Sequence, residues 1–267
     1  MTLLITLIIA AITYGTPLLF GTLGEILTEK SGNLNLGVEG IMFMGGALGL
    51  GGVYYYEKLS SSPTGFVAIL VGIFFAFLAG AIASLIFSFL TITLRANQNV
   101  TGLALSIFGT GIGQFIGEYM RVSENGYISV SNMLKGYFQN SPFPKGLQDI
   151  PVVGGILFGN SFFFYLAVAC AVALYWYLNK TRSGLYLRSV GESPATADAA
   201  GINVTRYKYL ATVIGGGVSA QQKLLIEPIA AKVRASVMPA FAEGLEIRAA
   251  QLHNDAGMVG AVYYFRQ

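Results

Sequence analysis

Residues 31–52 read SGNLNLGVEGIMFMGGALGLGG, a short polar segment followed by a dozen residues that carry hardly a polar side chain. The whole chain of 267 residues is 54% hydrophobic and only 11% charged, whereas a soluble domain is usually about 25% charged. Its apolar residues lie in long blocks, and a block of about 20 such residues is what a bilayer-spanning helix needs. The stretch therefore indicates a membrane span that begins with polar side chains.

Five apolar blocks are long enough, or nearly long enough, to cross a bilayer. A sixth, residues 209–220, stops after 12 residues at the sequence QQK. We therefore predict an all-α integral membrane protein, a polytopic helix bundle of about five full spans and a truncated sixth, with a short soluble helical tail. The five predicted spans are 3–24, 34–56, 65–94, 100–117 and 162–178, with 65–94 taken as one long helix.

The distribution of charge orients these spans. Between Lys180 and Lys208 there are five cationic residues and two acidic ones, and loops rich in Lys and Arg stay on the cytoplasmic side of a membrane. Counting the spans backwards from this loop places the polar stretch 120–161 outside. We expect that stretch to be an external loop with a short helix on the membrane surface at 151–159.

The C-terminal residues differ in composition from the rest of the chain. Residues 221–267 carry nine charges in 47 positions, with apolar residues at helical spacing, which predicts a soluble segment with an amphipathic helix at about 228–238. The chain holds one cysteine and one histidine, Cys170 and His253, so the usual Cys/His metal cluster cannot be assembled. We predict no catalytic residue, metal or cofactor, and any ATP chemistry would belong to another chain.

Three polar residues, Asn33, Asn35 and Glu39, stand at the start of the second predicted span. A carboxylate inside the bilayer costs on the order of 3 kcal/mol unless it finds a partner or water, so these side chains should face the bundle interior. On a helix beginning near Leu34, Asn35 and Glu39 would share one face. Their role is either hydrogen bonding to a neighbouring helix, including a structural cap, or contact with a translocating solute.

A second polar set begins the fourth predicted span. Such residues can simply cap a helix at the membrane interface, but their recurrence at two span entrances also suits a polar path or gate. The set comprises Asn97, Gln98, Asn99 and Thr101.

The cationic loop contains a short predicted helix. Ser193 is placed as its N-cap, Pro194 as its first residue and Gly201 at its C-terminal end. It is either an ordinary capped loop helix or a docking element for another protein. For docking, Glu192 and Asp198 could pair with basic residues of a partner, and four small residues could seat in its groove, namely Ala195, Ala197, Ala199 and Ala200.

Three stretches, 16–49, 95–117 and 184–220, resemble the permease subunits of bacterial ATP-binding-cassette importers for branched-chain amino acids, ribose and nucleosides, in the nucleoside and simple-sugar branch. The resemblance covers about 3–220. It implies a multi-pass subunit of the bacterial cell membrane that translocates a nucleoside or simple sugar. It also implies cytoplasmic ATPase subunits, a second permease subunit of the same or homologous sequence and an extracytoplasmic substrate-binding lipoprotein as partners. The loop helix around 192–201 would then be the coupling helix, and several spans would be missing after Ala220.

The last residues resemble a different family. LEIRAAQLHNDAGMVGAVYYFRQ, 245–267, is similar to the C-terminus of ROK-family sugar kinases and repressors. We therefore expect two parts, a truncated permease membrane domain at 1–220 and a soluble helical tail at 221–267. The alternative to a permease is a non-functional chimera of a truncated permease and a kinase fragment. A sugar-phosphorylating enzyme is the weakest interpretation, because the phosphate-binding segment, catalytic aspartate and zinc cluster of that family have no counterpart here.

Overall fold

The computed structural model describes residues 2–123, 130–150 and 153–220 of the chain. The predicted soluble tail, 221–267, with its helix at 228–238, lies outside these residues. Within the described ranges the chain forms helices and no strands. The long helices are α1 (Thr2–Glu29), α2 (Val38–Leu59), α3 (Gly65–Ser88), α4 (Gln98–Ser123), α7 (Phe162–Lys180) and α10 (Val204–Ser219).

Shorter helices connect the long ones. Two of them are π-helical turns, η1 (Phe89–Thr93), which continues α3, and η2 (Gly154–Phe158). The others are α5 (Asn132–Gln139), α6 (Lys145–Gln148), α8 (Arg182–Glu192) and α9 (Pro194–Ala199).

Four of the described helices are long and apolar enough to cross a membrane, which makes the chain a multi-pass membrane protein. They correspond to four of the five predicted spans, and 65–93 is one continuous helix. The remaining block, 34–56, corresponds to α2, whose 22 residues include many glycines, one charged residue near the start and two near the end. Its passage through the membrane stays a prediction. The four spans are 5–29, 65–93, 98–122 and 162–180.

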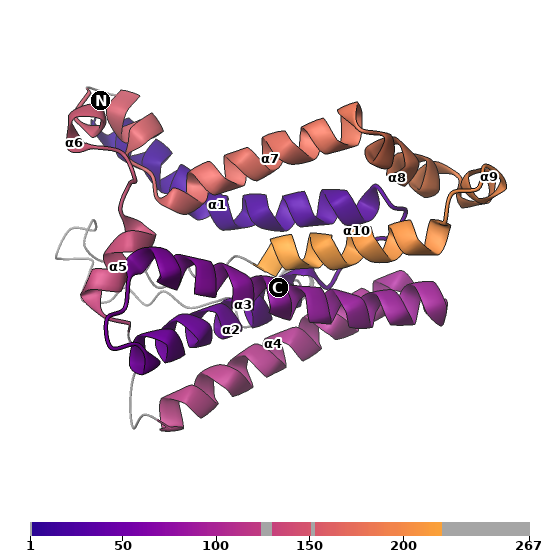
Figure 1. The fold of residues 1–267 in the computed structure, drawn as a ribbon, viewed down its shortest axis with the longest axis horizontal. Coiled ribbons are helices and arrows are strands. Elements are labelled where there is room, and N and C mark those ends of the chain that lie inside the picture. The colour runs from indigo at the N-terminus through magenta and orange to yellow at the C-terminus, as the bar shows by residue number, and fades with distance from the viewer. Residues whose placement is uncertain (1, 124–129, 151–152, 221–267) are drawn as a thin grey trace, which may run out of the picture. The chain divides into compact units, whose positions relative to one another are not determined.

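The long helices lie side by side, each packed against the next (Figure 1). Their order in space is α7, α1, α10, α3, α2 and α4. The order in space differs from the order in sequence because α10, the last described helix, inserts between α1 and α3. Helices α8 and α9 lie beyond one set of ends of the long helices, on the right in Figure 1, and α5 and α6 lie beyond the opposite ends.

Glycines permit the insertion of α10. A Cβ atom on Gly24 of α1 would overlap the carbonyl oxygen of Gly215 on α10, and one on Gly80 of α3 would overlap that of Gly216. Lipid provides no hydrophobic drive between helices, so small residues that let backbones approach closely are what stabilise such contacts. On the α1 side, the Ser219 hydroxyl also donates to the Gly21 carbonyl at 3.3 Å. α10 therefore joins the two halves of the row.

Two segments differ from their predicted boundaries. The truncated sixth span was predicted from 209, but α10 begins at Val204, because the Asn203 side chain accepts a hydrogen bond from Arg206 N at 2.9 Å and caps the helix. In the predicted loop 120–161, the chain forms α5, α6 and η2. The predicted surface helix at 151–159 is present only as η2, since residues 151–152 lie outside the described part.

Replacing Gly24 with alanine tests the close packing of α10 on α1. The added methyl group would collide with the backbone of Gly215 and the hydroxyl of Ser219, and overpacking of this kind costs roughly 1–3 kcal/mol. We expect a lower midpoint of thermal unfolding in detergent. Gly15→Ala on the same helix is the matched control, because nothing lies within 4 Å of its added methyl group. Equal midpoints for the two variants would contradict the packing described.

Candidate functional site

The segment between α1 and α2, residues 31–37, is a loop with a turn at each end and not the first turn of a helix. Side chains alternate along it, with Asn33 and Asn35 buried and Leu34 and Leu36 exposed. The prediction of a helix from Leu34 is wrong, since α2 begins at Val38. The Asn35 side-chain oxygen accepts a hydrogen bond from Gly37 N at 2.9 Å, and such local side-chain to backbone bonds compete with helix formation.

Neighbouring helices satisfy the backbone of the 31–37 loop. On the α1 side, Asn35 N donates to the Glu25 carboxylate at 2.9 Å. On the α4 side, Leu34 N donates to the Gln98 side-chain oxygen at 2.8 Å, and the Ser106 hydroxyl donates to the Leu36 carbonyl at 2.9 Å. The loop is thus bound to two helices that do not pack next to each other.

The Asn33 side chain adds a third helix to this arrangement. Its amide nitrogen donates to the Thr212 hydroxyl of α10 at 3.0 Å, and both side chains are buried. Hydrogen bonds between buried side chains of neighbouring helices are an attested means of association in membranes. We call the group the polar junction, and it comprises the 31–37 loop with Glu25, Thr28, Gln98, Ser106 and Thr212.

Glu39 does not face the bundle interior, contrary to the prediction. It lies exposed in the first turn of α2, a position where the helix dipole favours an acid. Because the helix starts after Asn35, the two residues do not share a helix face. The carboxylate next to Asn35 is that of Glu25, which our sequence reasoning missed. The signal that could have revealed it is that Glu25 stands between apolar residues, one helical turn before the charged pair Glu29 and Lys30.

The second polar set begins α4 as predicted, with separate roles for its members. The Asn97 side chain accepts a hydrogen bond from Val100 N at 3.1 Å, which caps the helix. Gln98 reaches the polar junction through Leu34 N, whereas Asn99 is exposed and Thr101 half-buried. The structure therefore brings the two polar sets together through Gln98. A role for either set in contacting a solute stays a prediction.

The predicted loop helix is confirmed as α9. The Ser193 hydroxyl accepts from Thr196 N at 3.4 Å, Pro194 is the first residue, and Gly201 has a φ of +81°, the left-handed conformation that glycine adopts at a helix end. Four of the proposed docking residues, Glu192, Asp198, Ala199 and Ala200, are exposed.

Ala197 does not belong to the docking surface, contrary to the prediction. It is only 3% exposed and faces the chain's own interior. The exposed small residues of α9 are Ala195, Ala199 and Ala200.

Helix α8, which was not predicted, connects α9 to the polar junction. Thr181 caps its start by accepting from Gly184 N at 3.0 Å. Near its other end, a Cβ atom on Gly191 would overlap the Lys30 carbonyl oxygen and would also lie 3.1 Å from the backbone nitrogen of Gly32, which has a φ of +81°. The loop helices and the polar junction are thus in direct backbone contact.

The residues that the structure describes contain no group of three His, Cys, Asp or Glu side chains that could hold a metal ion. His253 lies outside the described residues. The site consists of amides, hydroxyls and one carboxylate engaged in hydrogen bonds, an arrangement suited to positioning helices and binding polar groups.

Comparison with known proteins assigns residues 7–221 to a family described as the permease component of branched-chain amino acid transport systems. The nucleoside transporter permease NupC of Lactococcus lactis is 34% identical over 204 residues, 76% of this chain and 61% of that protein. The guanosine transporter permease NupQ of Bacillus subtilis is 33% identical over 208 residues, 78% of this chain and 62% of that protein. The chain thus spans about three fifths of the length of these relatives.

The C-terminal part is similar to other proteins. The ROK family matches residues 180–267, a range that overlaps the permease match. A glucokinase of Halalkalibacterium halodurans is 44% identical over 55 residues, 21% of this chain and 17% of the enzyme. These matches confirm the predicted resemblance of the tail to the ROK family. No solved structure matches the chain.

A double-mutant cycle on Asn33→Ala and Thr212→Val tests the hydrogen bond between the polar loop and α10. Unfolding in mixed micelles should give a coupling free energy of about 1 kcal/mol, the order found for hydrogen bonds between membrane helices. Thr22→Val is the control partner, because the Thr22 hydroxyl donates to the Leu18 carbonyl of its own helix. Its effect should simply add to that of Asn33→Ala, and additivity in both cycles would refute the contact.

Proposed function

The chain belongs to the family of permease components of branched-chain amino acid transport systems, and from this membership we propose that it is the membrane-embedded permease subunit of an ATP-driven importer. Nucleosides or simple sugars are the proposed solutes, and the names of the two permease relatives favour a nucleoside. ATP hydrolysis would take place on separate ATPase subunits. The other proposed partners are a second permease subunit and an extracytoplasmic substrate-binding lipoprotein, in the plasma membrane of a bacterium.

The observation that carries this proposal is the connection from an exposed loop helix to the interior. α9 is capped at both ends and presents Asp198 and Ala199 on its exposed side, and Glu192, the last residue of α8, is exposed just before it. α8 leads directly into α9, and Gly191, the penultimate residue of α8, contacts the loop between α1 and α2. A coupling helix needs both features, an accessible surface for the ATPase and a stiff connection to helices that move. We assign α9 this role, with its face toward the cytoplasm.

The solute path is proposed to pass by the first turn of α4 and the start of α2. Asn33 and Asn35 lie in the polar junction there, with Gln98 beside them. Asn99, Thr101 and Glu39 lie on the turns that follow and are at least partly exposed. Amide, hydroxyl and carboxylate groups suit the hydroxyls of a ribose or the edge of a base. In this proposal the buried amides hold the helices and the exposed groups meet the solute.

The coupling role is tested by Glu192→Lys combined with Ala199→Arg. Both side chains are exposed, so the exchange should leave the fold intact while it reverses the charge and adds bulk on the docking face. We expect at least a tenfold loss of co-purified ATPase subunit, which corresponds to about 1.4 kcal/mol. Leu147→Arg on α6, an exposed site at the other end of the bundle, should leave the amount unchanged. Undiminished association of the double variant would rule out α9 as the coupling helix.

A second candidate, a non-functional chimera, is favoured by the two family matches. The permease match ends at residue 221, the chain spans about three fifths of its permease relatives, and the ROK match extends to residue 267. A sugar-phosphorylating enzyme would have to retain far more of the kinase than 17% of its length. It would also require ATP-dependent phosphorylation of sugars by the purified chain.

Sequencing of the source DNA across codons 215–225 separates a real chimera from a mistaken junction. If the chimera exists, the genomic reads contain the junction, and the purified chain supports no solute uptake when it is reconstituted with the neighbouring ATPase, lipoprotein and permease. An uninterrupted permease frame in the reads would contradict the chimera, whereas uptake by the reconstituted chain would establish the permease function with the junction in place.

A further inference from the structure

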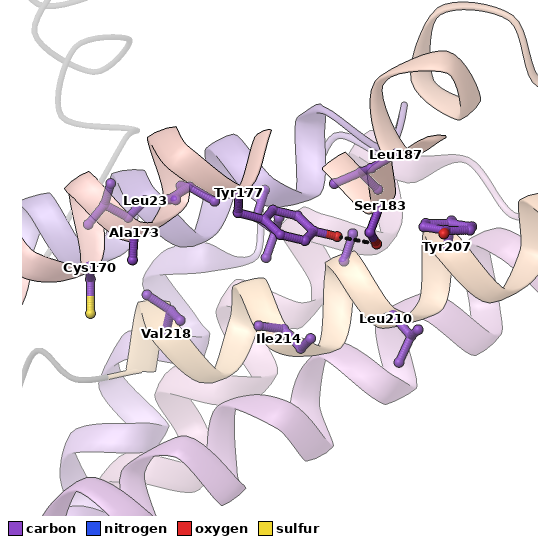
Figure 2. Close-up of a pocket in the computed structure, with 13 residues that line it drawn as sticks. Leu23, Cys170, Ala173, Tyr177, Ser183, Leu187, Tyr207, Leu210, Ile214 and Val218 are labelled. Atoms are coloured by element: carbon purple, nitrogen blue, oxygen red, sulfur yellow. Dashed lines mark hydrogen bonds between the residues drawn. The ribbon is translucent and has the colours of Figure 1, made fainter. Parts of the chain in front are cut away.

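An apolar groove of about 380 Å³ runs between α1, α7, α8 and α10. Figure 2 shows Leu210, Ile214 and Val218 following one another along α10, with Cys170 and Ala173 of α7 across from them. The polar contact drawn in it lies at one end, where the Tyr177 hydroxyl and the Ser183 hydroxyl share a hydrogen bond of 3.0 Å. The groove therefore has a long apolar part and one polar end, next to α8.

Each long helix that lines the groove has a cationic residue at or next to the helix end that lies at this polar end. Lys30 follows Leu27 of α1 by three residues, Lys180 follows Tyr177 of α7 by three, and Arg206 precedes Leu210 of α10 by four. Residues three or four apart lie on the same face of a helix. All three cations are exposed, and none of them forms an ion pair with another described residue.

Further positive charge lies in the same region. Arg182 and Arg188 belong to α8, and the Nε atom of Arg188 is buried without a hydrogen-bond partner in the described part of the chain. Of the acids of this region, Glu29, Glu192 and Asp198 are exposed, and the half-buried Glu25 accepts a hydrogen bond from Asn35 N. The cations outnumber them, so this end of the groove favours an anion.

We propose that the groove binds an anionic phospholipid, with one acyl chain along α10 and the phosphate among Lys30, Lys180 and Arg206. The groove is apolar along α10 and cationic at one end, which matches an acyl chain joined to an anionic headgroup. Basic pockets between membrane helices attract anionic headgroups, and long cationic side chains reach such headgroups while their stems cover apolar surface.

The experiment titrates the full chain, purified in a neutral detergent, with phosphatidylglycerol or phosphatidylcholine and counts bound lipid by native mass spectrometry. We expect one phosphatidylglycerol per chain at saturation and at least tenfold weaker retention of phosphatidylcholine. Ala173→Trp should abolish retention because it fills the groove. Val172→Trp is the matched control, since Val172 is 64% exposed and does not line the groove.

The charged end is tested separately by Lys180→Gln with Arg206→Gln, which should weaken phosphatidylglycerol binding at least tenfold. Lys145→Gln in α6, at the other end of the bundle, should leave phosphatidylglycerol binding unchanged. Unchanged phosphatidylglycerol binding in both the groove variant and the charge variant would overturn the proposal. The lipid would then belong to the general lipid coat of the protein.

The native Cys170 provides a readout that needs no mutation, because it is the one cysteine of the chain and lines the groove. Phosphatidylglycerol should slow its reaction with an apolar maleimide at least fivefold, and inorganic phosphate alone should leave the rate unchanged. Equal rates with and without the lipid would refute occupation of the groove. Protection by inorganic phosphate would refute the acyl chain as part of the ligand.

Discussion

The arrangement of the helices depends on how one non-helical segment satisfies its backbone inside a helical bundle. Buried peptide groups need hydrogen-bond partners within the protein, because leaving them unpaired is costly. The 31–37 loop finds them in the Glu25 carboxylate and in Gln98 and Ser106 of α4. Its Asn33 side chain binds Thr212. The loop thus sets the positions of α1, α4 and α10 together.

The contact with Thr212 requires α10 to lie deep between α1 and α3, and glycine makes that depth possible. Gly24 and Gly80 face Gly215 and Gly216 with no space for a side chain on either interface. The Ser84 hydroxyl on α3 lies in the same seam, buried and without a hydrogen-bond partner among the described residues. Close backbone packing and the polar junction therefore support each other. An α10 displaced outward would lose both its glycine contacts and its bond to Asn33.

Much of this architecture was predictable, because block length and helix caps are local properties of a sequence. The long apolar blocks became helices, and α9 formed between Ser193 and Gly201. The partners of the polar residues were not predictable from spacing. Leu34 binds Gln98, 64 positions away, and Asn33 binds Thr212, 179 positions away.

The errors have the same origin. A four-residue spacing suggested that Asn35 and Glu39 share a helix face, but a local bond from Gly37 N to the Asn35 side chain delays the helix until Val38. Ala197 was grouped with the other small residues of its helix, yet one side of a two-turn helix must cover the chain's own core. Pattern alone does not tell which side that is.

The proposed coupling helix and the proposed phospholipid site meet near Gly191. A displacement of α9 reaches α8 directly, and Gly191 of α8 leaves no gap to the Lys30 carbonyl. Lys30 is also one of the three cations at the polar end of the apolar groove. A phospholipid held there would bridge α1, α7 and α10 at the point where α8 meets the polar junction. Occupation of the groove would therefore stiffen the connection between the docking helix and the interior, since the three helices could no longer separate without releasing the headgroup.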